Sequence, residues 1–60
     1  GYRSDRGRIY IKYGPPDEIE DHAFELGTRP YIIWYYYYMD KKFTFVDRMG
    51  NGEYILWYSQ

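Results

Sequence analysis

The chain contains no cysteine, one histidine and one alanine among its 60 residues. Without cysteine, neither a disulfide nor a thiolate metal site can stabilise a domain that buries only about 60% of its unfolded surface. No apolar run approaches the ~20 residues of a membrane-spanning helix, so we predict no membrane insertion. These absences predict a single small domain over residues 1–60 that depends on its own core or on a partner.

The sequence also has no large excess of positive or of negative charge. Lysine and arginine number 8 against 9 acidic residues, which gives a net charge of -1. Nucleic-acid-binding modules are normally strongly basic. Residues 6–13 partly match an RNA-binding octapeptide, but Arg8 and Ile9 break the pattern at its third and fourth positions. We therefore predict no nucleic-acid partner.

The residues that are abundant favour β-structure. The chain has 10 tyrosines, 3 phenylalanines and 2 tryptophans, and aromatic residues are enriched in strands. Residues 8–13 alternate, with Ile9, Ile11 and Tyr13 on one face, which predicts a half-buried strand. Ser4 and Asp5 are predicted to cap the turn before it. Two prolines after Gly14 mark its end.

Acidic residues dominate the next segment, residues 17–30. We predict a long irregular loop there, or a short helix with Asp17 and Glu18 in its first turn. Because residues 1–13 are mostly basic, this acidic segment is expected to fold back near them. Such exposed ion pairs contribute only about 0 to 1 kcal/mol each.

The second half of the chain reads as three strands. Residues 31–39 are free of charge, glycine and proline until Asp40, and both alternating sets are apolar, which predicts a central strand with both faces partly covered. Asp40 and Lys41 connect it to a strand over residues 42–47, and residues 50–52 form a turn before a strand over residues 53–58. The predicted fold is mainly β, a four-stranded antiparallel meander with the loop or short helix between strands 1 and 2.

Residues for catalysis are scarce. His22 lies among acidic residues, but their spacing matches no calcium loop. The only serines are Ser4 and Ser59, and neither lies in a nucleophile turn. We predict that the chain is not an enzyme and has no catalytic residue, metal ligand or cofactor. An enzyme would need catalytic groups from elsewhere in a longer protein.

The aromatic residues carry the remaining functional signal. The simpler interpretation is that tyrosine replaces leucine and valine in the core. However, a single sheet has two faces, and residues 14–30 can cover only one. An aromatic face left open would form an association surface. The residues predicted for this interaction surface are Trp34, Tyr36, Tyr38, Trp57 and Tyr10.

Two functions remain open from these residues. The first is a non-catalytic protein-interaction or structural module, which binds another protein or its own copy through an aromatic sheet face or a strand edge. The alternative is a module that binds a small ligand, a glycan or cell-wall fragment, by stacking on tryptophan and tyrosine rings.

Several motifs in the chain match one family. The matching stretches are GYRSDRGRIYI at residues 1–11, YGPPDEI at 13–19, WYY at 34–36 and FVDR at 45–48. Together they resemble the bacterial GWxTD domain family, with Tyr2 and Ser4 in place of the Trp and Thr of its name. The resemblance implies a C-terminal module of a longer, often exported protein, and hence the cell envelope or a secreted location. It implies no known activity, and a chain that starts at Gly1 is also expected to be a piece of a longer protein.

Overall fold

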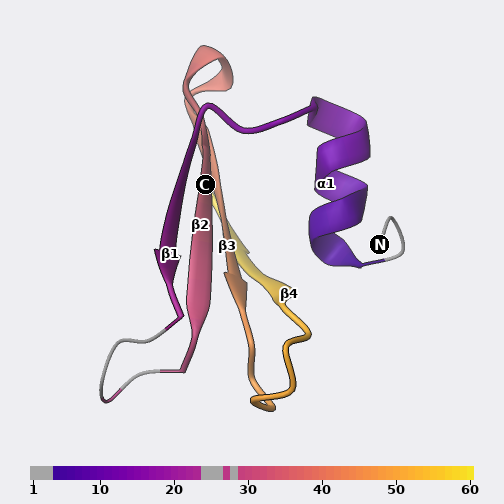
Figure 1. Ribbon diagram of the computed structural model, residues 1–60. Coiled ribbons are helices and arrows are strands. Elements are labelled where there is room, and N and C mark those ends of the chain that lie inside the picture. Colours follow the sequence, from indigo (N-terminus) through magenta and orange to yellow (C-terminus); the bar gives the residue numbers. More distant parts are fainter. Residues whose placement is uncertain (1–3, 24–26, 28) are drawn as a thin grey trace.

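The computed structural model describes residues 4–23, 27 and 29–60. A helix precedes four strands, and a short 3-10 turn separates the second strand from the third (Figure 1). The elements are α1 (Asp5–Tyr13), β1 (Glu18–His22), β2 (Tyr31–Tyr36), η1 (Tyr37–Met39), β3 (Lys41–Val46) and β4 (Ile55–Ser59). The strands form one antiparallel sheet in the order β1-β2-β3-β4. The predicted mainly β, four-stranded antiparallel meander is therefore confirmed.

The predicted strand over residues 8–13 is wrong, because these residues belong to α1. The Ser4 side chain accepts a hydrogen bond from the Gly7 N–H at 3.0 Å and so caps the helix N-terminus. Gly14 ends the helix with a φ of 79°, a conformation that favours glycine. Ile9 and Tyr13 pack on the core four residues apart, whereas Ile11 is exposed. The two core-facing residues are four positions apart, a spacing that fits one face of a helix as well as one face of a strand.

The predicted irregular segment or short helix after Asp17 is also wrong at its start, because residues 18–22 form β1. Glu18 pairs with Tyr35 and His22 pairs with Tyr31 in the register of β1 on β2. The tyrosine hydroxyls of Tyr35 and Tyr37 bond to carboxylates of β1. Tertiary pairing thus overrides the low strand propensity of acidic residues. The connection from β1 to β2 includes residues 24–26 and 28, which lie outside the described residues.

The central strand is confirmed as β2, which pairs with β1 on one side and β3 on the other. It ends at Tyr36 rather than Met39, because the Tyr37 N–H donates to the Asp17 carboxylate at 2.6 Å and the chain turns into η1. Asp40 then adopts a left-handed conformation, with φ at 51°, before β3 begins. Tyr38 therefore lies in the turn and not on the sheet face that was predicted for it.

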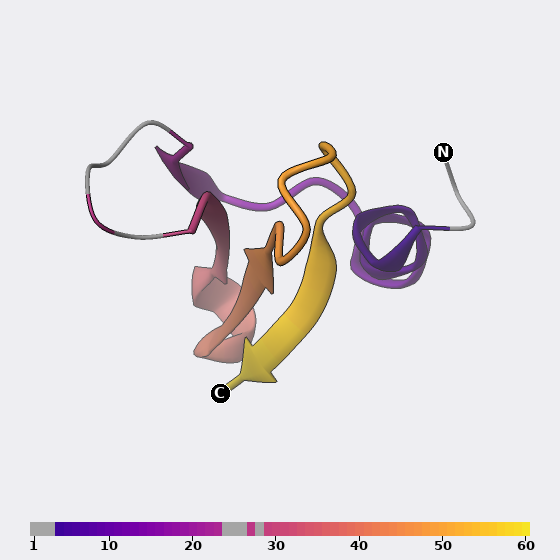
Figure 2. The same cartoon turned by 90° about the horizontal axis from the view of Figure 1, so that it is seen from below.

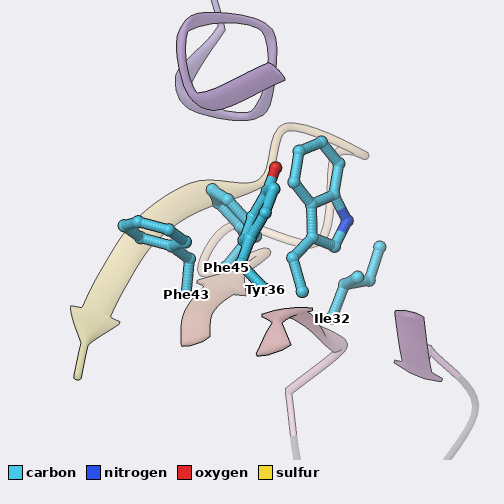
Figure 3. Close-up of a cluster of buried hydrophobic side chains, with 5 residues drawn as sticks. Ile32, Tyr36, Phe43 and Phe45 are labelled. Atoms are coloured by element: carbon cyan, nitrogen blue, oxygen red, sulfur yellow. The ribbon is translucent and has the colours of Figure 1, made fainter. Parts of the chain in front are cut away.

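The core lies between the sheet and α1 (Figure 3). Its buried side chains come from one face of the two central strands: Ile32, Trp34, Tyr36, Phe43 and Phe45. The Tyr13 ring of α1 stacks on Phe43, with ring centres 5.5 Å apart. The Tyr36 hydroxyl donates to the Gly14 carbonyl at 2.8 Å and so satisfies a carbonyl at the helix end. The sheet thus holds α1 by both apolar contact and a hydrogen bond.

The helix also contacts the far end of the chain. Figure 2 shows α1 on one side of the sheet, next to β4. An Asp5 carboxylate oxygen accepts a hydrogen bond from the Leu56 N–H at 2.6 Å. The Arg6 guanidinium lies over the Tyr54 ring, 4.7 Å from its centre. These contacts place the helix N-terminus beside the edge strand β4.

A turn built on Asp47 joins β3 to β4. Asp47 is only 4% exposed, and its two carboxylate oxygens accept hydrogen bonds from the N–H groups of Asn51 (3.1 Å) and Gly52 (2.8 Å). Its own N–H donates to the Pro30 carbonyl at 2.9 Å. One buried carboxylate therefore organises the turn that leads into β4.

Candidate functional site

Two of the predicted surface residues belong to the core. Trp34 is 8% exposed and Tyr36 is fully buried. The prediction that they form an open interaction surface is wrong, because α1 covers their face of the sheet and residues 8–13 were not expected to form a helix. Trp34 packs edge-on against Phe45, with ring centres 5.1 Å apart. The simpler interpretation, tyrosine and tryptophan as core, holds for this pair.

The other three predicted residues are exposed, but on three different elements. Tyr10 lies on α1, Tyr38 in η1 and Trp57 on β4. The Tyr38 hydroxyl donates to the Tyr13 carbonyl at 3.1 Å, so Tyr38 helps to hold the helix end. Trp57 is 58% exposed. Among the predicted residues, Trp57 is the exposed aromatic on a strand edge.

The two edges of the sheet differ in character. The β1 edge has the sequence EIEDH and carries three carboxylates, a charge pattern that discourages pairing with another strand. The β4 edge has the sequence ILWYS and carries no charge. Leu56, Trp57 and Tyr58 of β4 are all exposed. An exposed, uncharged edge strand is a template for pairing with another chain.

Cationic groups lie beside the uncharged edge. The Arg48 guanidinium sits 5.2 Å from the centre of the Trp57 ring, within the range of a cation–π interaction. Arg6 lies over Tyr54, which directly precedes β4. At the other end of the strand, Lys42 and Gln60 exchange two backbone hydrogen bonds at 2.9 and 3.0 Å. Two arginines, Arg48 and Arg6, thus lie near β4 together with the Asp5 carboxylate, whereas the described residues of β1 carry three carboxylates.

The sheet face opposite the core, here called the open face, has no described helix over it. Its residues alternate with the core residues: Glu18, Glu20 and His22 of β1, Tyr31, Ile33 and Tyr35 of β2, and Lys42, Thr44 and Val46 of β3. The β2 residues of this face are half-buried. The His22 ring stacks on Tyr31, with ring centres 4.4 Å apart. The open face thus combines a half-buried apolar centre with a charged rim.

Two tyrosine hydroxyls bond to carboxylates beside the open face. The Tyr35 hydroxyl donates to Glu20 at 2.8 Å, and the Tyr37 hydroxyl donates to Glu18. These bonds raise the pKa of Tyr35 above its usual value and raise the pKa of Tyr37 from 10.0 to about 12. Burial raises the pKa of Tyr36 in the core. The hydroxyls of Tyr35 and Tyr37 are therefore held as donors to β1.

The hydrogen bond from the Tyr37 hydroxyl to Glu18, which connects η1 to β1, is expected to be lost at high pH. Because folding raises the Tyr37 pKa, its contribution to stability is complete below pH 10 and is lost as the pH rises through about 12. A titration of carbon-labelled tyrosine Cζ resonances should show Tyr37 ionising near pH 12. The Glu18→Gln variant should move this ionisation back toward 10, and a Tyr37 that already ionises near 10 in the unchanged chain would contradict the prediction.

The same tyrosines line a hollow at one end of the open face. Its volume is about 340 Å³, and its walls are Tyr35, Tyr37, Asp40, Lys41, Lys42 and Gln60. Sequence reasoning missed this site, although the run of tyrosines followed by two lysines was visible. The missing signal was the η1 turn, which brings Tyr37 back beside Tyr35 and places their rings 5.9 Å apart at an interplanar angle of 23°.

No cluster of three or more histidine, cysteine or acidic side chains suited to a metal ion occurs in residues 4–23, 27 and 29–60. His22 instead contacts Tyr31 and lies 3.7 Å from a Glu20 carboxylate oxygen. Within the same described part of the chain, no helix is long and apolar enough to cross a bilayer. Ser4 serves as the helix cap.

Comparison with known proteins adds no relative. No family model matches the chain, and neither a curated protein nor a solved structure matches it significantly. The resemblance to the GWxTD family therefore stays a prediction, as do the bacterial origin and exported location that it implies.

Proposed function

We propose that the chain is a non-catalytic protein-interaction module that binds an extended, acidic segment of a partner protein along the edge strand β4. The contrast between the two sheet edges carries the proposal. β1 has three carboxylates along its five residues, whereas β4 has none and exposes three large apolar side chains. In strand addition, main-chain hydrogen bonds supply affinity and alternate side chains supply specificity.

The charge around β4 supports an acidic partner rather than a second β4 strand. Arg48 lies against Trp57 and Arg6 lies against Tyr54, so two copies paired through β4 would bring cations together. Complementary charge speeds encounter and disfavours partners of the wrong sign. The Asp5 carboxylate already accepts the Leu56 N–H. The chain thus already places one carboxylate beside β4. Because this contact occupies the Leu56 N–H, we expect a partner strand to pair with the part of β4 that begins at Trp57.

The side chains of this part of β4 are of the type that dominates binding energy. Trp57 and Tyr58 are 58% and 53% exposed. Tryptophan, tyrosine and arginine are the residues most often found at interface hot spots. We therefore expect Trp57 to contact an apolar residue of the partner and Arg48 to pair with an acidic residue next to it.

A titration followed by amide NMR tests this function. The probe is a short, end-blocked peptide of alternating valine and glutamate, and its counterpart of alternating valine and lysine is the charge control. The acidic peptide should shift the resonances of residues 55–60 in a saturable way, and the basic peptide should not. An acidic peptide N-methylated at alternate residues cannot pair as a strand and should lose the effect. Equal shifts with all three peptides would contradict strand addition.

A pair of variants tests the role of charge. Arg48→Glu should weaken binding of the acidic peptide at least about fivefold, because it reverses the charge beside Trp57. Arg29→Glu makes the same charge change in the loop between β1 and β2 and should leave binding unchanged. Dilution of the free chain provides a further check. If the resonances of residues 55–60 move with protein concentration alone, a second copy is the occupant and the proposed partner class is wrong.

A further inference from the structure

The turn between β3 and β4 (Figure 1) contains the only asparagine of the chain, Asn51, and a glycine follows it. Both residues are exposed to water. An asparagine side chain can react with the main-chain nitrogen of the next residue, and glycine in that place favours the reaction because no side chain obstructs the approach. This pair takes no part in the proposed function of β4.

The Asn51 side chain is folded back over the peptide unit that would attack it. Its Oδ1 accepts a hydrogen bond from the Glu53 N–H at 3.0 Å. Because this donor lies two residues further along the chain, the bond closes a ring that encloses the Gly52 nitrogen and keeps the side-chain carbonyl near it. The same N–H would stabilise the negative charge that forms on Oδ1 when a nucleophile adds to Cγ.

The attacking nitrogen has a carboxylate beside its proton. The Gly52 N–H donates to Asp47 Oδ2 at 2.8 Å, and the Asn51 N–H donates to Asp47 Oδ1 at 3.1 Å. Asp47 is only 4% exposed, so the protein holds its carboxylate in place. A carboxylate within hydrogen-bond distance of a proton can accept it while the new bond forms. One buried residue therefore fixes the main chain on both sides of the reacting side chain.

We propose that Asn51 is a site of spontaneous deamidation and that the folded turn accelerates the reaction, with Asp47 as the proton acceptor. The Gly52 nitrogen forms a bond to the Asn51 Cγ while its proton passes to Asp47 Oδ2. The Cγ–Nδ2 bond then breaks, and the proton returns from Asp47 through water to Nδ2, which leaves as ammonia. Water finally opens the cyclic imide at one of its two carbonyl groups, which leaves aspartate or isoaspartate at residue 51.

Either product changes the turn that leads into β4. Both place a new carboxylate near Asp47, and residue 51 lines the same hollow as Arg48. In the isoaspartate product the main chain runs through Cγ and is one methylene longer, so the Gly52 N–H moves relative to the Asp47 carboxylate that accepts it. The reaction therefore adds negative charge to a turn whose N–H groups already converge on one carboxylate.

The test measures the rate of deamidation in the intact, folded chain in neutral buffer. Trypsin cleaves after Arg48, so residues 49–60 are released as one peptide, in which mass spectrometry follows the conversion of amide to acid. The reference is an end-blocked synthetic peptide of residues 48–54, which lacks Asp47. Asn51 should react at least about tenfold faster in the folded chain. An equal or slower rate in the folded chain would overturn the proposal.

Two variants of the turn test the role of the carboxylate. Asp47→Asn keeps an oxygen acceptor but removes the base, and it should slow the reaction at Asn51 at least about tenfold. Any reaction at the new asparagine is measured separately, because residue 47 lies in the tryptic peptide 43–48. Glu53→Ala removes an exposed carboxylate, keeps the N–H that bonds to Asn51, and should leave the rate unchanged.

The amide spectrum of each variant shows whether it is folded. An unchanged rate in a folded Asp47→Asn variant, or an equal decrease in Glu53→Ala, would overturn the role of Asp47. The comparison of the folded chain with the peptide decides the proposal without any variant, so it stays valid if Asp47→Asn does not fold. Neither measurement depends on whether β4 binds a partner.

Discussion

Replacing Phe45 with alanine is expected to leave the chain largely unfolded near room temperature. Phe45 is fully buried, and it packs against Trp34 in the centre of the core. Truncation of a buried phenylalanine costs about 3 to 5 kcal/mol. A domain of this length has only about 3 to 9 kcal/mol of total stability. The melting temperature, followed by circular dichroism, should fall by at least about 12 °C.

The Phe45→Ala prediction has a matched control on the neighbouring strand. Tyr58→Ala removes an aromatic ring of similar size from β4, where the side chain is exposed. Because that ring is still largely in contact with water, its loss should cost less than about 1 kcal/mol. Similar losses for the two variants would mean that Phe45 is not the centre of the core.

The second large effect is expected at Asp47. Asp47→Ala leaves the N–H groups of Asn51 and Gly52 without the carboxylate that accepts their hydrogen bonds. Each hydrogen bond to a charged group contributes about 1.5 to 3 kcal/mol, but these two N–H groups lie in an exposed turn and regain part of that from water. We expect a net loss of about 2 to 3 kcal/mol in the free energy of unfolding. Urea denaturation measures it directly.

Two further variants separate the carboxylate from the turn itself. Asp47→Asn keeps one oxygen as an acceptor and should cost about 1 kcal/mol. Glu53→Ala removes an exposed carboxylate from the same turn and should have almost no effect. A loss at Glu53 as large as that at Asp47 would show that the net charge of the turn, and not its hydrogen bonds, sets its stability.

The second half of the fold could be predicted from the sequence because its signals are local. The apolar run that begins at Tyr31 and the glycine-rich turn at residues 50–52 are properties of adjacent residues, and β2, β3 and β4 follow from them. The first half could not be predicted in this way. Ile9 and Tyr13 fit both a strand and a helix, and the contacts that decide for the helix come from Tyr36 and Phe43, far along the chain.

The candidate sites show the same division. Trp57, which was predicted for an open aromatic surface, is exposed on β4. The burial of Trp34 and Tyr36 was missed because it depends on α1. The stacked pair of Tyr35 and Tyr37 depends on the η1 turn, which forms through the bond between Asp17 and the Tyr37 N–H. Sequence patterns indicate which side chains are apolar, but only the packed helix and turn decide which of them face solvent.

The meander order of the strands has a consequence for the path of folding. Every strand pairs with its neighbour in the chain, so the sheet grows by closing short loops. The bond between Asp5 and Leu56 instead joins residues 51 positions apart, and loop-closure entropy increases with that separation. We therefore expect the hairpins to form in the rate-limiting step and the helix to dock afterwards. Changes in α1 would then mainly accelerate unfolding, and changes in β2 and β3 would slow refolding.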